Sequence, residues 1–390
     1  MTAEAVRGTV DTRAAARAIA PVLAERAEEI ENARRLPRDL ADRLAREGFY
    51  RMLVPEVYGG LELAPATAME TIETLARADA SSAWCVFIGA TSGTTLALLP
   101  PDAAREVFSH PEVRIGGVFA PRGEATAQPG GFRVRGRWQW GSGTENCDWV
   151  LGGCRLVRDG EPERLPNGAP LSRMMLVPAA EVEFFDTWHV SGLCGTGSTD
   201  FAIHDVFVPA SRAVGLGVDR PLERPLYTFP AFGLLAMGIA AVALGLARAA
   251  LDCLVELAGG KTPTGSTRPL AARPSTWSEV ARAEARWRSA RAFYYEAIAT
   301  AWDCACERGA IDVTHRRDIR LATTHATRSA AAVVDAMYDL GGGTSVHRSC
   351  PLQRMFRDVH VATQHMMVGP ATLELAGRLL LGVEADVSAL

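Results

Sequence analysis

The stretch GLCGTGSTDFAIHDVFVP, residues 192–209, marks the point where the pattern of the chain changes. It begins with a glycine-rich turn and continues through Phe201–Val208, a short segment rich in apolar residues that ends at a proline. After Pro209 the chain carries long patterns with helical periodicity. We therefore expect this stretch to hold the last strand of a β domain that precedes a helical domain.

Short strand patterns fill the region before this stretch. They begin near residue 113 and have glycine or proline at their boundaries. The segments are Arg114–Phe119, Gly131–Gly136, Trp149–Leu151, Met174–Val177 and Val182–Val190. This spacing predicts an antiparallel β domain over residues 113–212.

Helical patterns lie on both sides of the β domain. They cover about 11–35, 37–47, 65–78 and 81–99 before it, and 230–257, 277–310, 313–340 and 351–381 after it, the last interrupted at Gly369-Pro370. Four helices of the latter length form a bundle. We predict a mainly helical α+β fold with an N-terminal helical domain (1–112), a central β-barrel or sandwich domain (113–212) and a C-terminal four-helix bundle (213–390).

The composition is that of an ordinary globular protein. Of 390 residues, 48% are hydrophobic and 22% are charged, and the formal net charge is -4. This balance excludes intrinsic disorder and, without a block of like charges, argues against nucleic-acid binding. The eight cysteines form no C-x-x-C pair, and the first 35 residues hold no apolar core of a signal peptide. We expect reduced thiols and a cytoplasmic location.

One uncharged run, Pro225 to Ala247, is long enough to cross a bilayer. Its internal prolines and glycines, and the charged continuation at Arg248, Asp252 and Glu256, favour instead the central helix of a bundle. We therefore expect no membrane span.

Several common catalytic motifs are absent from the sequence. It contains no G-x-x-x-x-G-K, no dinucleotide-binding G-x-G-x-x-G, no G-x-S-x-G elbow and no H-E-x-x-H. His360 and His365 are five residues apart, so they do not stack on one helix face as metal ligands would. We expect no metal site and no binding motif for NAD(P)H.

The motif GRWQWGSG, 136–143, combines two tryptophans with a tight Gly-Ser-Gly turn. One interpretation is a core strand followed by a turn. The other is a platform for a planar ring, where small residues allow close approach, Trp140 stacks and the Ser142 hydroxyl makes a hydrogen bond.

The motif GGGTSVHR, 341–348, precedes PLQR, 351–354, and FRD, 356–358. A glycine-rich, hydroxyl-bearing turn before a helix offers the donors that a phosphate requires. The charged side chains of this region could bind phosphate or could form an ion-paired network that fixes the helix start. They are Arg348, Arg354, Arg357 and Asp358.

These segments resemble the acyl-CoA dehydrogenase superfamily over essentially the whole chain. The resemblance rests on G-L-x-G-T-G-S before V-F-V-P, on P-L-Q-R-x-F-R-D, and on Gln364-His365. It is stronger to the branch of two-component (group D) flavin-dependent monooxygenases than to the true dehydrogenases. The architecture of the superfamily, a helical domain, a β domain and a four-helix bundle, agrees with the predicted order of elements.

The sequence disfavours dehydrogenation. Members that dehydrogenate need a carboxylate to remove an α-proton. In most relatives this acid follows the R-D pair by several residues, but here no acid lies between Asp358 and Glu374. The family's alternative position, on the first bundle helix, falls in the uncharged run 225–247.

The resemblance implies an oxygenase that takes reduced flavin, FMNH2 or FADH2, from a separate NAD(P)H:flavin reductase. With O2 as co-substrate it forms a flavin C4a-hydroperoxide and hydroxylates or oxygenates a small aromatic, indole-like or amine substrate, a chemistry compatible with secondary metabolism. The resemblance also implies a homotetramer. The alternatives are a FAD-dependent acyl-CoA dehydrogenase-like oxidoreductase and a non-catalytic flavin-fold binding subunit.

The resemblance assigns catalytic roles to His365, at the hydroperoxide, and to Ser142, at flavin N5 or O4. The residues expected to bind the flavin are Trp140, Gly141, Ser142, Gly343, Thr344, Ser345, Val346, Gln364 and His365. Of these, 343–346 would meet the flavin phosphate across a subunit interface. Asp358, Val361 and His365 lie at helical spacing, so we expect His365 to point inward from the last helix. The alternative for His365 is a hydrogen-bonded core histidine.

The sequence departs from its phenol-hydroxylating relatives at one point. Those relatives carry a histidine on the helix before the β domain, and the matching stretch here, 89–94, has none. Simple phenol ortho-hydroxylation is thus in doubt. We expect Thr91, Ser92, Phe119 and Phe232 to line a pocket for another electron-rich substrate, although Phe232 is also typical of plain core.

Overall fold

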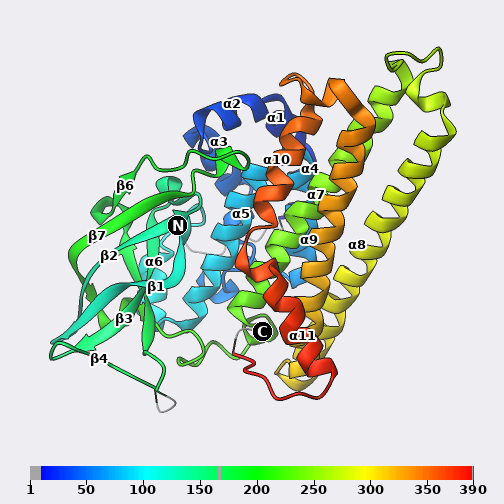
Figure 1. Cartoon of the computed structure of the whole chain (residues 1–390). Coiled ribbons are helices and arrows are strands. Elements are labelled where there is room, and N and C mark those ends of the chain that lie inside the picture. Colours follow the sequence, from blue (N-terminus) through cyan, green and yellow to red (C-terminus); the bar gives the residue numbers. More distant parts are fainter. Residues whose placement is uncertain (1–9, 166–167, 389) are drawn as a thin grey trace.

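A mixed β-sheet lies against one side of a helical body in the computed structural model, which describes residues 10–165, 168–388 and 390 (Figure 1). The longer helices are α1 (Thr12–Glu25), α2 (Ala27–Ala33), α3 (Arg38–Arg46), α4 (Pro65–Ala78), α5 (Ala80–Ser92), α6 (Pro101–Val107), α7 (Ala231–Gly260), α8 (Pro274–Arg308), α9 (Val313–Gly341), α10 (Pro351–Ala362) and α11 (Pro370–Leu380). The strands are β1 (Ile115–Gln128), β2 (Gly131–Gly141), β3 (Trp149–Arg158), β4 (Glu161–Pro162), β5 (Ser172–Pro178), β6 (Glu183–Phe185), β7 (Thr199–Pro209) and β8 (Ala213–Val214). The order of helices, strands and helices confirms the predicted fold class.

The strands form one sheet in the order β6-β7-β2-β1-β3-β5-β8, with β4 paired to β3. Neighbours are antiparallel except β1 and β3, which run parallel. The β domain is thus a mixed sheet and not the purely antiparallel one expected from the sequence. After the β1–β2 hairpin the chain crosses over and returns along the free side of β1, and strand periodicity does not reveal such a return.

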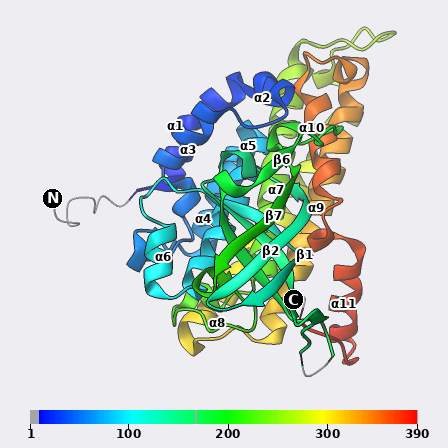
Figure 2. The same cartoon turned by 90° about the vertical axis from the view of Figure 1, so that its left-hand side faces the viewer.

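The sheet and the helices meet as two layers. In Figure 1 the sheet lies beside α5, and in Figure 2, turned by 90°, β1, β2 and β7 lie in front of α7. Helix α5 contacts β1 on one side and α7 on the other. Residues on α5 can therefore reach both the sheet and the C-terminal helices.

Helix α7 is the central helix of the C-terminal domain and packs against α4, α5, α8, α9 and α10. Among the described residues it is the helix that is long and apolar enough to span a membrane, and 94% of its most apolar window is buried inside the protein. Glycine permits this packing. A Cβ on Gly238 would lie 2.4 Å from Phe87, and one on Gly245 would lie 2.5 Å from the Glu73 carbonyl oxygen. Its burial makes α7 a core helix.

The last helical segment is divided earlier than the sequence suggests. Helix α10 ends at Ala362, and His365 has an extended backbone before the short 3-10 helix η11 (Met366–Val368). The Thr363 hydroxyl donates to the His360 carbonyl oxygen at 2.7 Å, an alternative to helical pairing. The expectation that His365 projects from a continuous helix is therefore wrong, because it lies in the connection after α10.

Candidate active site

The Ser142 hydroxyl is buried where β2 ends, and two other segments contact it. The indole N–H of Trp84, on α5, donates to Ser142 Oγ at 3.1 Å. Ser142 Oγ lies 2.6 Å from Ser198 Oγ, at the start of β7. Behind them, the buried Trp138 stacks on Phe201 with ring centroids 5.2 Å apart and holds β2 against β7. The position of Ser142 is thus set by strand packing and by Trp84.

A chain of buried hydroxyls continues from Ser142 into the glycine-rich turn. Ser198 Oγ lies 2.7 Å from Thr196 Oγ1, and Thr196 Oγ1 donates to the Leu193 carbonyl oxygen at 2.8 Å. The amide of the same Leu193 donates to Asp358 Oδ1, on α10, at 2.6 Å. The quoted stretch therefore joins Ser142 to the C-terminal domain through hydrogen bonds.

Asp358 is a buried carboxyl with an unusual pKa. Desolvation and the nearby Asp79 raise its pKa to about 7, against the lowering effects of the Leu193 amide, Arg354 and Arg357. Arg357 pairs with Glu31 on α2 at 2.6 Å and donates to the Ser191 carbonyl oxygen at 2.6 Å. Arg357 is thus ion-paired, as one of the two sequence interpretations expected, whereas Asp358 forms no ion pair with any described residue and accepts a backbone N–H.

His365 reaches the same region from the connection after α10. Its ring centroid lies 6.0 Å from that of Trp84, with 56° between the rings. The Met367 amide donates to His365 Nδ1 at 3.2 Å, which places the proton of a neutral ring on Nε2. Burial and, secondly, the positive charge of Arg320 lower the His365 pKa to about 4. His365 is therefore a neutral hydrogen-bond donor near pH 7.

Arg320, on α9, joins the candidate site through its charge near His365, and no sequence motif marks it. It is 3% exposed, its Nη1 donates to the Phe232 carbonyl oxygen at 3.4 Å, and its buried Nε has no hydrogen-bond partner among the described residues. Burial lowers the Arg320 pKa to about 10. A lone arginine on the apolar face of a helix was the available signal. The unpaired Nε is a donor suited to a bound ligand.

Two of the expected pocket residues meet in the structure. Phe119 on β1 and Phe232 on α7 face each other edge to face, with ring centroids 6.3 Å apart. Thr91 and Ser92 are buried on α5, and the Thr91 hydroxyl donates to the Phe87 carbonyl oxygen of its own helix at 2.8 Å. The aromatic pair is thus placed between sheet and bundle, whereas the Thr91 proton is already engaged.

Trp140 and Gln364 lie outside the buried network. Trp140 has a left-handed backbone (φ 67°) and an exposed fraction of 65%, so its indole is uncovered. Gln364 is exposed, and its amide donates to Thr363 Oγ1 at 3.1 Å. Gly141 is confined, because a Cβ there would lie 2.8 Å from Thr144 Oγ1. The turn next to Ser142 therefore offers an exposed aromatic face beside a buried hydroxyl.

The expected phosphate turn forms the short 3-10 helix η10 (Gly342–Val346) between α9 and α10. The Ser345 hydroxyl donates to the Tyr338 carbonyl oxygen at 2.8 Å, Val346 is exposed, and a Cβ on Gly343 would meet open space. Lys261, the only lysine of the sequence, donates to the Gly341 carbonyl oxygen and to Thr344 Oγ1, the latter at 2.7 Å. Lys261 belongs to no sequence motif, and its uniqueness among 41 Lys and Arg residues is the one signal that marks it.

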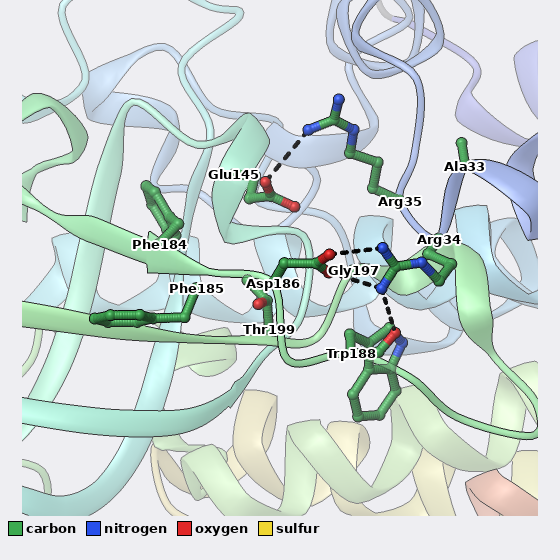
Figure 3. A pocket seen from close by; sticks show the side chains of 10 residues that line it. All are labelled: Ala33, Arg34, Arg35, Glu145, Phe184, Phe185, Asp186, Trp188, Gly197 and Thr199. Carbon is green, nitrogen blue, oxygen red and sulfur yellow. Dashed lines mark hydrogen bonds and ion pairs between the residues drawn. The ribbon is translucent and has the colours of Figure 1, made fainter.

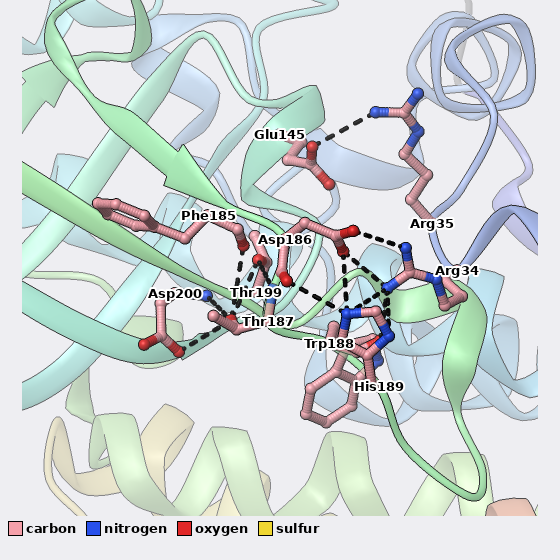
Figure 4. Close-up of polar contacts among 10 residues, drawn as sticks. All are labelled: Arg34, Arg35, Glu145, Phe185, Asp186, Thr187, Trp188, His189, Thr199 and Asp200. Carbon is pink, nitrogen blue, oxygen red and sulfur yellow. Dashed lines mark hydrogen bonds and ion pairs between the residues drawn. The ribbon is translucent and has the colours of Figure 1, made fainter.

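A pocket of about 370 Å³ lies between the end of α2 and the strands β6 and β7 (Figure 3). It is lined by Ala33, Arg34, Arg35, Glu145, Phe184, Phe185, Asp186, Trp188, Gly197 and Thr199. Arg34 donates to both carboxylate oxygens of Asp186, at 2.7 and 2.9 Å, and lies against His189 (Figure 4). None of these residues was expected in a site, because they come from four separate segments, one of which, 33–35, lies over 100 residues before the others.

A second polar cluster lies at the turn between α8 and α9. Ligand atoms of Cys304, Asp312 and His315 lie within 4.8 Å of one another. Asp312 accepts the His315 backbone N–H at 3.0 Å and contacts His315 Nδ1 at 2.8 Å, so its carboxylate caps α9. Asp312 and His315 are thus brought together by the capping of α9, which explains the cluster without a ligand.

Comparison with known protein families agrees with this geometry. The family model "Acyl-CoA dehydrogenase, N-terminal domain" matches residues 4–106, and "Acyl-CoA dehydrogenase, C-terminal domain" matches residues 237–370. The chain is 36% identical over 356 residues to an indole-3-acetate monooxygenase of Pseudomonas putida, covering 91% of this chain and 89% of that protein. It is 30% identical over 371 residues to the flavin-dependent monooxygenase oxygenase subunit HsaA of Rhodococcus jostii, covering 90% and 93%.

Solved structures agree with these matches. The 3-HSA hydroxylase from Rhodococcus sp. RHA1 superposes with a TM-score of 0.90 at 27% identity, over 97% of this chain and 99% of that one. XiaF from Streptomyces sp., solved with FADH2 and glycerol, superposes with a TM-score of 0.88 at 28% identity, over 97% and 98%. The chain therefore belongs to the acyl-CoA dehydrogenase fold family and, within it, to the oxygenase components of two-component flavin-dependent monooxygenases.

Proposed function

We propose that this enzyme receives reduced flavin from a separate reductase and uses O2 to hydroxylate an aromatic substrate of the indole type, in the cytoplasm. The observation that carries the proposal is that Ser142 and the neutral His365 both lie against Trp84. Both are uncharged hydrogen-bonding groups, and Ser142 is buried whereas His365 is half-buried. The first acid after Asp358 is Glu374, which is exposed on α11. No carboxylate therefore follows Asp358 at the position where dehydrogenases carry their base.

The residues present fit a flavin ring. Trp140 offers an exposed aromatic face, Ser142 offers a buried hydroxyl beside it, and Arg320 holds an unpaired donor. These three groups, with His365, would hold the ring between β2 and the bundle. Reduced flavin, when bound, supplies the two electrons with which O2 is activated.

The chain's own residues provide donors and a dry environment for this chemistry. His365 Nε2–H can donate to a developing oxygen charge without titrating near pH 7, since the His365 pKa is about 4. Phe119 and Phe232 can orient a planar substrate by edge and face contacts. Apolar side chains such as Phe119 and Phe232 would reduce access of water to a bound flavin, which limits loss of the activated oxygen as H2O2.

The phosphate turn supports a site shared between subunits. The turn η10 precedes α10, and His365 follows α10. The two are therefore separated by the length of α10, whose 12 residues extend about 18 Å. The short ribityl chain between the ring and the phosphate of FMN cannot span this distance. We infer that η10 serves the flavin of a neighbouring chain, as the expected homotetramer requires.

The substrate class rests on two observations. Two relatives with 36% and 34% identity are indole-3-acetate monooxygenases, of Pseudomonas putida and Acinetobacter baumannii. The stretch 89–94 lacks the histidine that would take up a phenol proton. An indole needs no such base for attack by an electrophilic oxygen, because its ring is electron-rich when neutral.

Isotope incorporation tests the proposal. The purified chain is supplied with FMN or FAD reduced by a separate reductase, with indole or indole-3-acetate and with 18O2. We expect a product that contains one 18O atom, measured by mass spectrometry. Complete conversion of O2 to H2O2 with both flavins and all substrates, together with reduction of bound FAD by acyl-CoA thioesters, would establish the dehydrogenase alternative instead. Failure to bind flavin would favour the non-catalytic one.

A further inference from the structure

We propose that the hydroxyl chain behind Ser142 makes the site selective for reduced over oxidised flavin, with Thr196 and Ser198 as positioning residues. The inference rests on the proposed function, because it takes the flavin ring to lie against Ser142. It concerns the direction of the hydrogen bonds in the chain and not only their presence.

The direction is fixed at the far end of the chain. The Leu193 carbonyl oxygen carries no proton, so the 2.8 Å contact with Thr196 Oγ1 requires the Thr196 proton. Thr196 can then only accept in its 2.7 Å contact with Ser198, and the Ser198 proton lies in that contact. Ser198 in turn can only accept from Ser142, at 2.6 Å. Each hydroxyl has one proton, and each is assigned.

Ser142 is thereby left as an acceptor. Its single proton is directed at Ser198, and one of its two lone pairs receives the Trp84 indole N–H at 3.1 Å. One lone pair remains for a ligand. A group that meets Ser142 must therefore bring its own proton.

The two redox forms of flavin differ in this respect. Reduced flavin carries a proton on N5 and can donate, whereas N5 of oxidised flavin has a lone pair and can only accept. A donor at N5 satisfies Ser142, and an acceptor at N5 places two lone pairs in contact. An enzyme that takes reduced flavin from a reductase and must release the oxidised form gains turnover from this difference.

Reversing the direction of these hydrogen bonds is costly because other groups hold both the N–H and the carbonyl oxygen of Leu193 in place. Its amide donates to Asp358, and its carbonyl also receives the Trp188 indole N–H at 3.1 Å. If the Thr196 proton turned to Ser198, two oxygen atoms would remain 2.8 Å apart without a proton between them. Oxidised flavin can thus obtain a donated proton from Ser142 only if this arrangement is broken.

Anaerobic equilibrium ultrafiltration with FMN and FAD, oxidised or reduced with dithionite, measures both dissociation constants. For the wild-type chain we expect tighter binding of the reduced form. Thr196→Val frees the Ser198 proton, and Ser198→Ala frees the Ser142 proton, so each variant allows Ser142 to donate. We expect each to lower the ratio of Kd for oxidised to Kd for reduced flavin roughly three- to tenfold, the contribution of one hydrogen bond.

Two controls test whether the direction of the hydrogen bonds among the hydroxyls causes the change in the Kd ratio. Thr199→Val makes the same change nearby, where the hydroxyl contacts Thr187 and not Ser198, and should leave the ratio unchanged. In a Ser142→Ala background, Thr196→Val should also have no effect on the ratio. An unchanged ratio in both chain variants, with flavin still bound, would overturn this inference and leave the proposed function standing. No binding of either form to the wild type would overturn both.

Discussion

His365 and Arg320 show how a single residue is adjusted by its surroundings. Burial and the nearby guanidinium lower the His365 pKa to about 4, and the Met367 amide directs the ring proton to Nε2. A histidine that stays neutral between pH 5 and 8 donates one hydrogen bond without carrying charge. Its role then depends on that proton and not on acid–base exchange.

Replacement of His365 tests this role. His365→Ala should lower the ratio of oxygenated product to H2O2 about tenfold, because one donor to the activated oxygen is lost. His365→Gln retains an N–H donor and should keep more of the coupling. Product by chromatography and H2O2 by a peroxidase assay give the ratio. His325→Ala, on the exposed face of α9, is the control, and equal coupling in His365→Ala would remove His365 from the chemistry.

Asp358 gives a pH dependence of stability with the opposite sign to that of the buried histidine. Its folded pKa of about 7 lies above the roughly 3.9 of an unfolded aspartate, so folding takes up a proton between these values. The stabilising contribution is full below pH 4 and is lost as the pH rises through 7. Asparagine mimics the protonated carboxyl at every pH.

We therefore expect Asp358→Asn to gain about 2 kcal/mol of unfolding free energy, relative to the wild type, between pH 5 and pH 8. Urea denaturation at the two pH values measures it. Asp303→Asn, at an exposed carboxyl of α8, should show no such change. If the difference in unfolding free energy between Asp358→Asn and the wild type were the same at both pH values, folding would take up no proton at Asp358 in this range, which contradicts the raised pKa.

At the level of elements, the sequence predicts regular structure well and its junctions poorly. The predicted helix 230–257 corresponds to α7, and five of the predicted strands coincide with parts of β1, β2, β3, β5 and β7. The sixth, Val182–Val190, is a strand only over β6, Glu183–Phe185. The early end of α10 was not predictable, because a Thr363 hydroxyl and the Arg328 guanidinium satisfy the freed carbonyls there. Nor was the contact of Trp84 with Ser142, since those residues are 58 positions apart in the sequence.

The same distinction applies to the candidate site. Ser142 and His365 could be proposed because short motifs mark them, whereas the partners that determine their hydrogen bonding come from other elements. Thr196 and Ser198 lay in a quoted motif without an assigned role. Arg320 and Lys261 act through tertiary contacts that no local pattern encodes.

The junction between the glycine-rich turn and α10 is tight enough to test by one methyl group. A Cβ on Gly192 would lie 2.4 Å from the Arg357 carbonyl group. We expect Gly192→Ala to lower the unfolding free energy by about 2 kcal/mol, since backbone cannot yield as a side chain can. Gly377→Ala on α11, where a Cβ meets open space, should instead gain up to about 1 kcal/mol. Equal effects in urea denaturation would contradict the close contact.

At the scale of the whole molecule, the separation of the two proposed flavin-binding regions predicts an assembly. Light scattering should give four chains of 41.7 kDa each. Mixing by refolding provides a sharper measurement. Ser142→Ala impairs the ring side of a site and Lys261→Ala the phosphate side, so mixed assemblies should regain some intact sites and bind more flavin than either variant alone. A monomer that binds flavin fully would contradict the shared site.

The single lysine has a further consequence. An endoproteinase that cuts only after lysine has one target bond in the chain, between Lys261 and Thr262. The Lys261 ammonium is engaged by the Gly341 carbonyl and the Thr344 hydroxyl, so the protease must wait until this contact opens. The rate of that one cleavage therefore reports the local opening of η10, and a bound phosphate that holds the turn closed would be recorded as protection of a single peptide bond.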